Sequence, residues 1–256
     1  MKIIADRNIP FIEGRVKGAE LIMLPAAEID KKAVRDADAL IVRTRTRCDA
    51  SLLKDSKVKV IATATIGTDH IDIPWCTQHG ITVRNAPGCN APGVALYVWA
   101  SLLRHGFEPR ESTLGVIGCG NVGGIVAHWG ERLGARILVC DPPRKELGLK
   151  DHEYLPLEEL MTQSDAVTVH TPLTMEGSYP TFHMINEVTL GSLRQGAVFV
   201  NAARGEVAAT GSLCMAIAEG KIRHAIIDTW ENEPNIDPHL LSLADVATCH
   251  IAGYSV

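Results

Sequence analysis

The 256-residue sequence predicts an α/β protein with two parallel sheets, the larger of them doubly wound. Three observations support this fold class. Short apolar runs recur along the chain, with polar, helix-compatible segments between them. One of these runs leads into three closely spaced glycines and then into a helical pattern. Between the two halves lies Asn85–Pro92, a segment rich in helix and strand breakers that predicts a domain linker.

Residues 1–90 are predicted to form the smaller α/β domain. Polar loops follow two of its strands, at Arg43–Arg47 and at Ala64–His70. Because ligands collect beyond the carboxyl ends of parallel strands, both loops are candidate substrate contacts. Three arginines in the first loop could bind a phosphate or a carboxylate, although a solvated basic rim is an equally good interpretation. His70 is predicted to be structural. Strands are expected near residues 2–5, 20–24, 39–42, 58–63 and 81–83.

Residues 91–256 are predicted to form the larger domain, which begins with a helix over residues 93–105. The apolar face of this helix is wide, so we expect it to be buried against the next domain or in an oligomer interface. Six strands with helices between them match a doubly wound parallel sheet. They are expected at residues 113–117, 136–140, 165–169, 197–201, 224–228 and 245–249.

The first strand of this domain runs into a G-x-G-x-x-G pattern. Gly118 permits a tight turn, Gly120 lets the backbone approach a pyrophosphate, and Gly123 allows close packing of helix on strand. The alternative is a tight turn with no ligand, but the order of strand, loop, helix, strand and acid favours a dinucleotide. The following helix is predicted to carry Val122, Ile125, Val126 and Trp129 on one face. The expected cofactor contacts in the loop are Gly118, Gly120, Asn121, Val122 and Gly123.

The second strand of the larger domain ends on an acid that indicates which dinucleotide binds. Asp141 is placed to accept hydrogen bonds from the 2′-hydroxyl of an adenosine ribose, which favours NAD over NADP. Arg144 leaves this choice open, since a nearby arginine could accommodate a 2′-phosphate.

Composition and charge exclude several other classes. A net charge of −5 gives no reason to expect nucleic acid as a partner, and the longest apolar run, Val94–Leu103, is too short to span a membrane. The sequence opens on the strand-like Lys2–Ala5, which predicts no secretory signal. Its seven cysteines form no C-x-x-C pair, so we expect free thiols and a cytoplasmic location.

Four polar side chains follow successive strands of the larger domain, and these strand ends share one edge of the sheet. His250 is the best candidate for a base that takes the proton of a hydroxy acid. Glu233 could hold the second ring nitrogen of His250 and so fix its tautomer. Arg204 could bind the substrate carboxylate, and Asp228 could hold a nicotinamide carboxamide.

Each of these residues has a simpler interpretation as a surface ion pair or a structural histidine. Their coincidence at one sheet edge favours hydride transfer to a nicotinamide. Three other histidines, His170, His183 and His224, lack this arrangement and are predicted to be structural. No spacing of histidines, cysteines and carboxylates indicates a metal site.

The chain resembles the D-2-hydroxyacid dehydrogenase family nearly end to end. This resemblance implies a Rossmann-type NAD domain with a smaller, flavodoxin-like α/β substrate domain, and a catalytic set of Arg204, Glu233 and His250. It is carried by the glycine loop and by His170–Leu173, Asn201–Glu206, Asp228–Pro234 and His250–Gly253.

Further stretches are similar to one branch of that family, which acts on a small phosphorylated hydroxy acid. This closer resemblance implies substrate contacts at Thr44, Thr65 and Tyr254, and a homodimer in the full-length form. It implies NAD contacts at Asp141, Thr171, Asp228 and Gly253. The similar stretches are Ala64–His70, Asn85–Asn90, Val139–Arg144, Glu176–His183 and His250–Tyr254.

Two departures from the family pattern stand out. Family members continue past the matching histidine into a C-terminal dimerisation domain, whereas this sequence ends at Val256. The stretch Val207–Gly211 lacks the aspartate usual after the valine, so we expect a weaker start to the next helix. The alternatives in function are a dehydrogenase for another acid, such as 3-phosphoglycerate or glycerate, an NAD-sensing interaction protein similar to a corepressor, and a remnant that binds nucleotide without turnover.

Overall fold

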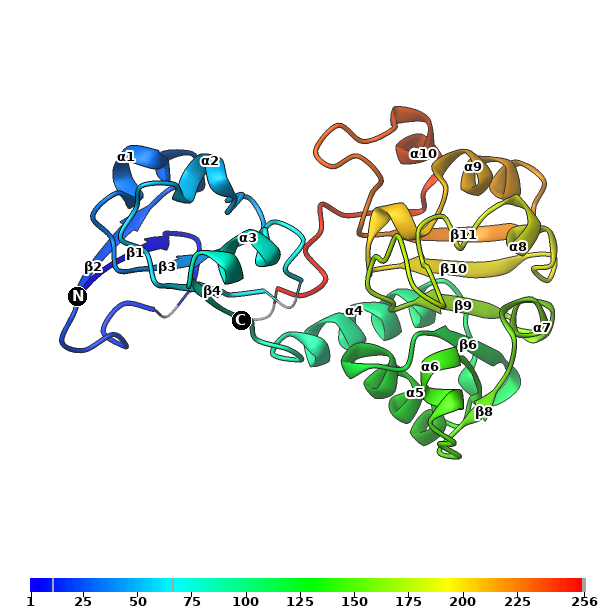
Figure 1. Ribbon diagram of the computed structural model, residues 1–256. Helices are drawn as coiled ribbons and strands as arrows, with labels where there is room; N and C mark the ends of the chain where they lie inside the picture. The colour runs from blue at the N-terminus through cyan, green and yellow to red at the C-terminus, as the bar shows by residue number, and fades with distance from the viewer. Residues whose placement is uncertain (11, 66, 255–256) are drawn as a thin grey trace. The chain divides into compact units, whose positions relative to one another are not determined.

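The chain forms two compact units, Met1–Cys89 and Asn90–Val256, each built around one parallel sheet (Figure 1). The computed structural model describes residues 1–10, 12–65 and 67–254. The predicted loop Ala64–His70 is therefore described except at Ile66, which lies outside these residues with Phe11, Ser255 and Val256.

The sheet of the first unit has five parallel strands in the order β2-β1-β3-β4-β5. This is the strand order of flavodoxin-like folds, so the predicted class is confirmed for this unit. The predicted strands agree with the observed ones to within two residues at their ends. The strands are β1 Lys2–Asp6, β2 Glu20–Leu24, β3 Ala39–Val42, β4 Val60–Thr63 and β5 Thr82–Arg84.

Three short helices of the first unit each begin at an aspartate. Asp30, Asp49 and Asp72 accept hydrogen bonds from backbone N–H groups of the first turn, at 2.8, 2.9 and 3.0 Å. These caps fix where the chain leaves each loop and packs onto the sheet, over a core that includes Leu40 and Ile61. The helices are α1 Lys31–Val34, α2 Ala50–Leu53 and α3 Ile73–Gln78, with a short 3₁₀ helix, η1, at Ala26–Glu28.

The sheet of the second unit has seven parallel strands in the order β12-β11-β10-β9-β6-β7-β8. Counted from β6, this is the Rossmann order 3-2-1-4-5-6 with one further strand at the edge, so the predicted doubly wound sheet is confirmed. All six predicted strands are present. The strands are β6 Thr113–Ile117, β7 Arg136–Cys140, β8 Glu153–Tyr154, β9 Ala166–Val169, β10 Ala197–Asn201, β11 Ile222–Ile227 and β12 Val246–Ala247.

Helices cover both faces of this second sheet, and alternate side chains of each strand point to opposite faces. On β10, Phe199 packs in one cluster with Leu160 of α7 and Leu213 of α9, whereas Val198 and Val200 pack in the other cluster with α4 and α5. The helices are α4 Ala91–Arg104, α5 Asn121–Leu133, α6 Pro142–Glu146, α7 Leu157–Gln163, α8 Glu187–Gly191, α9 Thr210–Ala218 and α10 Pro238–Leu243, with 3₁₀ helices η2 Pro109–Glu111 and η3 Gly205–Val207.

Helix α4 begins inside the segment that the sequence indicated to be a linker. Ala91 and Pro92 belong to its first turn, where proline is tolerated because the N–H groups there have no partner within the helix. The predicted apolar face is largely buried and extends to Trp99, which donates its indole N–H to the Val126 carbonyl at 3.1 Å. This face packs on α5 of the same unit.

The predicted apolar face of α5 packs on the core: Val126 is buried, and Val122, Ile125 and Trp129 are partly buried against the same cluster. Gly123, Ala127 and Gly130 are buried as well. These small residues are needed because the helix lies so close to its neighbours that a Cβ on Gly123 would come within 1.9 Å of the Gly118 carbonyl oxygen. The spacing of apolar residues alone does not predict where glycines allow such close packing.

The start of α9 agrees with the expectation of a weak cap and adds a compensating contact. Its N-cap residue, Ala209, makes no capping hydrogen bond through its side chain. Instead, Glu231 from the loop after β11 accepts a hydrogen bond from the Thr210 N–H at 3.1 Å. In the part of the chain that the structure describes, no helix is long and apolar enough to cross a membrane.

Candidate active site

The glycine loop lies at the point where the strand order of the second sheet reverses, between β6 and β9. Gly118 has φ +85°, a conformation that side chains rarely adopt, and a Cβ there would meet Thr171 Cγ2 at 2.8 Å. A Cβ on Gly120 would meet nothing within 4 Å, so the loop is open on that side. Helix α5 begins at Asn121, and the N–H groups of its first turn point beyond its start.

The groups around this loop fit a bound dinucleotide. The Thr171 hydroxyl is buried and has no hydrogen-bond partner among the described residues, although buried polar atoms almost always have one. It lies beside Gly118, at the carboxyl end of β9. An open turn, a helix N-terminus and a buried hydroxyl without a partner are what a pyrophosphate needs.

Asp141 ties the glycine loop to the next helix. Its carboxylate accepts hydrogen bonds from the Cys119 N–H at 2.8 Å and from the Arg144 N–H at 3.0 Å, which caps α6. The Arg144 side chain is held in turn by Asp151 at 2.8 Å and by the Tyr154 hydroxyl at 3.1 Å. These bonds, first that to Tyr154 and then that to Asp151, raise the pKa of Arg144 above its usual range.

The loop after β10 is shaped by the buried side chain of Asn201. Its amide donates to the Arg204 carbonyl at 3.0 Å, and its oxygen accepts from the Ala203 N–H at 3.2 Å. Gly205 then packs so closely on the next loop that a Cβ there would lie 1.9 Å from the Trp230 carbonyl carbon. This contact brings Arg204 to the loop that carries Glu233.

Glu233 and His250 form a hydrogen-bonded pair, with 3.0 Å between Oε2 and Nδ1. The other carboxylate oxygen accepts the Trp230 N–H at 2.9 Å. Burial raises the pKa of Glu233, but the hydrogen bonds from His250 and Trp230 and the charge of Arg204 outweigh it and leave the pKa lowered. Three of the four sequence-predicted groups at this edge therefore interact.

The fourth, Asp228, is buried and organises the loop that carries His250. Its Oδ1 accepts hydrogen bonds from the Thr248 hydroxyl at 2.6 Å and from the Ile251 N–H at 2.9 Å. Its Oδ2 accepts the Ala252 N–H at 3.0 Å, and its carbonyl accepts the His250 N–H at 2.8 Å. A carboxylate offers about four lone-pair positions, so one on Oδ2 remains for a further donor.

The histidines that we predicted to be structural each have a partner in the fold. His183 contacts Glu231, and His224 lies 3.0 Å from Asp245. His170 contacts the Thr168 hydroxyl at 2.9 Å, and its burial lowers the pKa of its ring to about 3. In residues 1–10, 12–65 and 67–254 there is no group of three or more histidines, cysteines or carboxylates that could hold a metal ion.

Asn90 lies at this site and was missed in the sequence. It is the N-cap residue of α4 but makes no capping bond, and its Oδ1 is buried without a partner in the described residues. Its amide nitrogen packs on Gly253, where a Cβ would approach it to 2.2 Å. The available signal was an asparagine directly before a helix, which the breaker-rich Asn85–Pro92 segment concealed.

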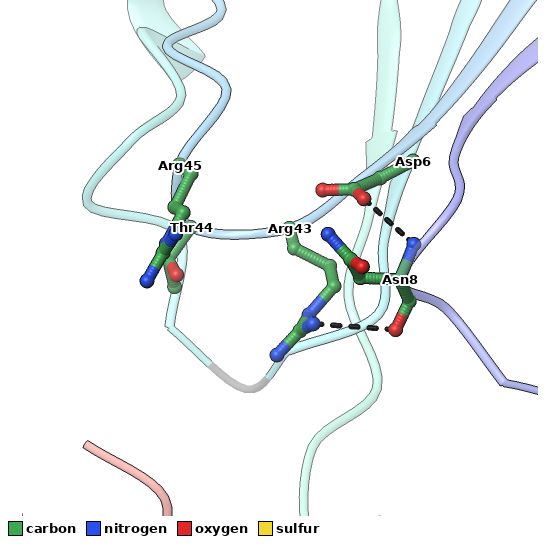
Figure 2. A pocket seen from close by; sticks show the side chains of 5 residues that line it. All are labelled: Asp6, Asn8, Arg43, Thr44 and Arg45. Atoms are coloured by element: carbon green, nitrogen blue, oxygen red, sulfur yellow. Dashed lines mark hydrogen bonds between the residues drawn. The ribbon is translucent and has the colours of Figure 1, made fainter. Parts of the chain in front are cut away.

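In the first unit, a pocket of about 260 Å³ lies at the carboxyl ends of β1 and β3. It is lined by Asp6, Asn8, Arg43, Thr44 and Arg45 (Figure 2). Arg43 donates to the Asn8 carbonyl at 3.2 Å, and the Asn8 N–H donates to Asp6 at 2.9 Å. Thr44 is thus placed together with two of the three predicted arginines.

The other predicted groups of the first unit are not among the residues that line this pocket. Arg47 forms a surface ion pair with Asp49 at 3.0 Å, as in the simpler interpretation of the basic loop. The Thr65 hydroxyl is 2.7 Å from that of Thr63, which also lies 3.1 Å from His70 Nε2. His70 therefore has a partner that the sequence did not reveal.

The known proteins that this chain is similar to belong to one family of dehydrogenases. Residues 93–252 match the family described as D-isomer specific 2-hydroxyacid dehydrogenase, NAD binding domain. The whole chain is 44% identical over 261 residues to an erythronate-4-phosphate dehydrogenase from Bacteroides fragilis, and covers 75% of that protein. It is 42% identical over 266 residues to the enzyme of the same name from Proteus mirabilis, and covers 69% of it.

Solved structures of other dehydrogenases have the same fold as this chain. A D-lactate dehydrogenase from Aquifex aeolicus, complexed with NAD and lactic acid, matches all of this chain with a TM-score of 0.83 and 26% identity, over 90% of its own length. An NAD⁺-bound 3-phosphoglycerate dehydrogenase from Entamoeba histolytica matches with a TM-score of 0.82 and 29% identity, over 89% of its length.

Proposed function

The chain belongs to the D-isomer specific 2-hydroxyacid dehydrogenase family, and from that premise we propose that it oxidises 4-phospho-D-erythronate to 3-hydroxy-2-oxo-4-phosphonooxybutanoate with NAD. This reaction is a step in pyridoxal 5′-phosphate (vitamin B6) biosynthesis. The observation that carries the proposal is the hydrogen-bonded pair of Glu233 and His250 beside Arg204, at the sheet edge that bears the glycine loop.

The second unit is the NAD-binding domain in this proposal. NAD, when bound, accepts the hydride from C2 of the substrate. The buried Thr171 hydroxyl and the open turn at Gly120 support binding of the pyrophosphate, and the remaining lone pair of Asp228 Oδ2 supports binding of a carboxamide N–H. The proposed contacts are Gly118, Gly120, Asn121, Val122, Gly123, Asp141, Thr171, Asp228 and Gly253.

His250 is the proposed acid/base, and its tautomer follows from its partner. The lowered pKa of Glu233 keeps this carboxylate ionised, so it only accepts hydrogen bonds and Nδ1 of His250 must carry the hydrogen. Nε2 is then the ring nitrogen that takes the C2 hydroxyl proton. Arg204 binds the substrate carboxylate and polarises the developing carbonyl in this scheme.

The first unit is the proposed substrate domain. Its pocket places Thr44 with Arg43 and Arg45, and two guanidinium groups suit a doubly charged phosphate better than a neutral group. Asp6 in the same pocket carries the opposite charge and would favour a ligand that also offers hydroxyl donors. Thr65 and Tyr254 are the further proposed substrate contacts.

We also propose that the protein is cytoplasmic and forms a homodimer. Seven free cysteines support a reducing compartment. Leu96 and Leu103 on α4 are 62% and 49% exposed, and they lie seven residues apart on one face of the helix, which supports contact with a second copy. Light scattering of the purified chain at several concentrations measures this directly.

Substrate profiling tests the proposed reaction. NADH formation is followed with 4-phosphoerythronate beside 3-phosphoglycerate, glycerate and lactate at equal concentrations. We expect kcat/KM to be highest for 4-phosphoerythronate. A higher value for 3-phosphoglycerate would assign another substrate within the same family. Binding of NAD without turnover of any of the four acids would favour a sensing role instead.

Replacement of the base tests the mechanism. His250→Ala is expected to lower kcat by about 10²-fold or more, since general base catalysis contributes about 10² to 10⁴. NAD affinity, measured by fluorescence titration, should stay near that of the wild type. His239→Ala is the matched control, because this exposed histidine lies on α10, away from the cluster. An unchanged kcat in His250→Ala would remove this residue from the mechanism.

A further inference from the structure

We propose that Tyr97 and Thr248 are positioning residues for the catalytic histidine, acting through the buried carboxylate of Asp228. This inference rests on the proposed role of His250. The proposal connects helix α4, which carries Tyr97, to the loop that carries His250. Neither the Tyr97 hydroxyl nor the Thr248 hydroxyl touches a reacting atom in the proposed mechanism.

A continuous chain of short hydrogen bonds carries the inference. The Tyr97 hydroxyl lies 2.8 Å from the Thr248 hydroxyl, which lies 2.6 Å from Asp228 Oδ1. The same carboxylate accepts the N–H groups of Ile251 and Ala252, the two residues that follow His250. The orientation of Asp228 therefore fixes the backbone of residues 251 and 252, directly after His250.

The direction of each hydrogen bond follows from counting protons. A threonine hydroxyl has one proton to donate. Thr248 donates that proton to Asp228 Oδ1. Tyr97 then has to donate to Thr248. Burial raises the pKa of Tyr97, so the phenol keeps its proton at the pH of any ordinary assay.

The loop needs this support because its conformation is unusual. His250 has φ +58°, a left-handed conformation that is costly for a residue other than glycine and persists only where the surroundings impose it. Its N–H is held by the Asp228 carbonyl at 2.8 Å, and its ring by Glu233. Thr248 also accepts the Trp230 indole N–H on its carbonyl at 2.7 Å, so both ends of the loop are fixed.

Four variants of the full chain separate positioning from general stability. Thr248→Val keeps the shape and removes the hydroxyl, and Thr248→Ser restores a hydroxyl. Tyr97→Phe removes only the hydroxyl that donates to Thr248. The double variant Tyr97→Phe/Thr248→Val completes a double-mutant cycle, which measures whether the two hydroxyls act together. Thr162→Val is the matched control, because the exposed Thr162 hydroxyl bonds only to a backbone carbonyl of its own helix, at 2.8 Å.

The first measurement is amide hydrogen exchange at Ile251 and Ala252, which reports on the loop without any substrate. In Thr248→Val we expect both amides to exchange about tenfold faster, the loss expected for one buried hydrogen bond to a charged group. Thr248→Ser should return them to near the wild-type rate. Exchange rates unchanged in Thr248→Val would overturn the proposal.

The second measurement is steady-state kinetics. In Thr248→Val we expect kcat to fall about tenfold while KM for the acid changes less than twofold, because the base is misplaced rather than the substrate released. Tyr97→Phe should have a smaller effect, and none in the Thr248→Val background. Additive effects would contradict a single chain of hydrogen bonds. If the wild type turns over none of the acids, the proposed function fails, and the exchange rates alone decide the positioning role.

Discussion

At the scale of single residues, one carboxylate decides the chemistry of the proposed base. Glu233 accepts from both His250 and the Trp230 backbone, and it remains ionised because these donors and Arg204 outweigh its burial. An ionised partner at Nδ1 also stabilises the imidazolium that forms when Nε2 takes a proton. The charge of Glu233, as well as its position, is therefore part of the proposed mechanism.

Glu233→Gln tests that charge. The amide oxygen can still accept from Nδ1, with the amide NH2 group then facing the Trp230 N–H in place of an acceptor, while the negative charge that stabilises the imidazolium is lost. We expect kcat to fall by more than about tenfold, the loss for a hydrogen bond to a charged group. Glu231→Gln is the matched control, since Glu231 also pairs with a histidine, His183, but lies outside the cluster. Equal losses in the two variants would argue against a specific role for Glu233.

Cofactor choice is also set by individual side chains. Asp141 faces the glycine loop, and Arg144, which could otherwise bind a 2′-phosphate, is held by Asp151 and Tyr154. We expect Asp141→Ser to lower kcat/KM for NAD about tenfold or more through the lost charged acceptor. Adding Asp151→Asn removes the charged partner of Arg144, which Tyr154 also holds, and should raise kcat/KM for NADP above that of Asp141→Ser alone. The ratio of the two cofactors' kcat/KM values measures this, and no gain with NADP would show that Arg144 does not reach the phosphate.

At the scale of secondary structure, the strands followed from the sequence, because a fully buried parallel strand is a short continuous apolar run. Strands β6, β7 and β10 have the predicted bounds. The edge strand β8 was missed, because its two residues, Glu153 and Tyr154, are not part of an apolar run. The apolar face of α5 followed from the sequence, but the close packing of its glycines at positions 123 and 130 did not, because their fit depends on the atoms that lie against them rather than on hydrophobicity.

The close packing of Gly123 in α5 against the glycine loop can be tested by substitution. In Gly123→Ala the new methyl group would meet the Gly118 carbonyl oxygen at 1.9 Å, so helix and strand must separate. We expect a loss of several kcal/mol of unfolding free energy, or failure to fold, as for overpacking against rigid backbone. Gly124→Ala is the control, because its methyl group would lie 3.8 Å from the nearest atom. It should be neutral or stabilising by up to about 1 kcal/mol, and urea denaturation compares the two.

At the scale of the whole molecule, the sequence predicted which polar residues meet but not what holds them together. Arg204, Asp228, Glu233 and His250 could be placed at one edge because they follow successive parallel strands. Asn90, Tyr97 and Thr248 could not, since they act through contacts between segments far apart in the chain. Long-range side-chain contacts of this kind carry no periodic signal, so the supporting residues appear only in the folded structure.

A half-buried histidine makes the stability of the second unit depend on pH. Burial lowers the pKa of His170 to about 3, from an ordinary value of 6.5. Above pH 6.5 the ring is neutral in both the folded and the unfolded chain, so it contributes no pH dependence. Below pH 6.5 the unfolded chain binds a proton that the folded chain excludes, so stability falls as the pH drops toward 3, by up to about 1.4 kcal/mol per pH unit.

Urea denaturation at pH 7, 6 and 5 measures this effect, in a Trp75→Phe background that leaves tryptophans 99, 129 and 230, all in the second unit, as the fluorescent probes. His170→Gln should lower the slope of unfolding free energy against pH by about 1 kcal/mol per unit between pH 6 and 5, because glutamine does not titrate. His239→Gln, at an exposed site, is the matched control for the replacement of a histidine by glutamine. An equal slope in His170→Gln and in the reference chain would show that His170 is protonated as readily in the folded state as in the unfolded one.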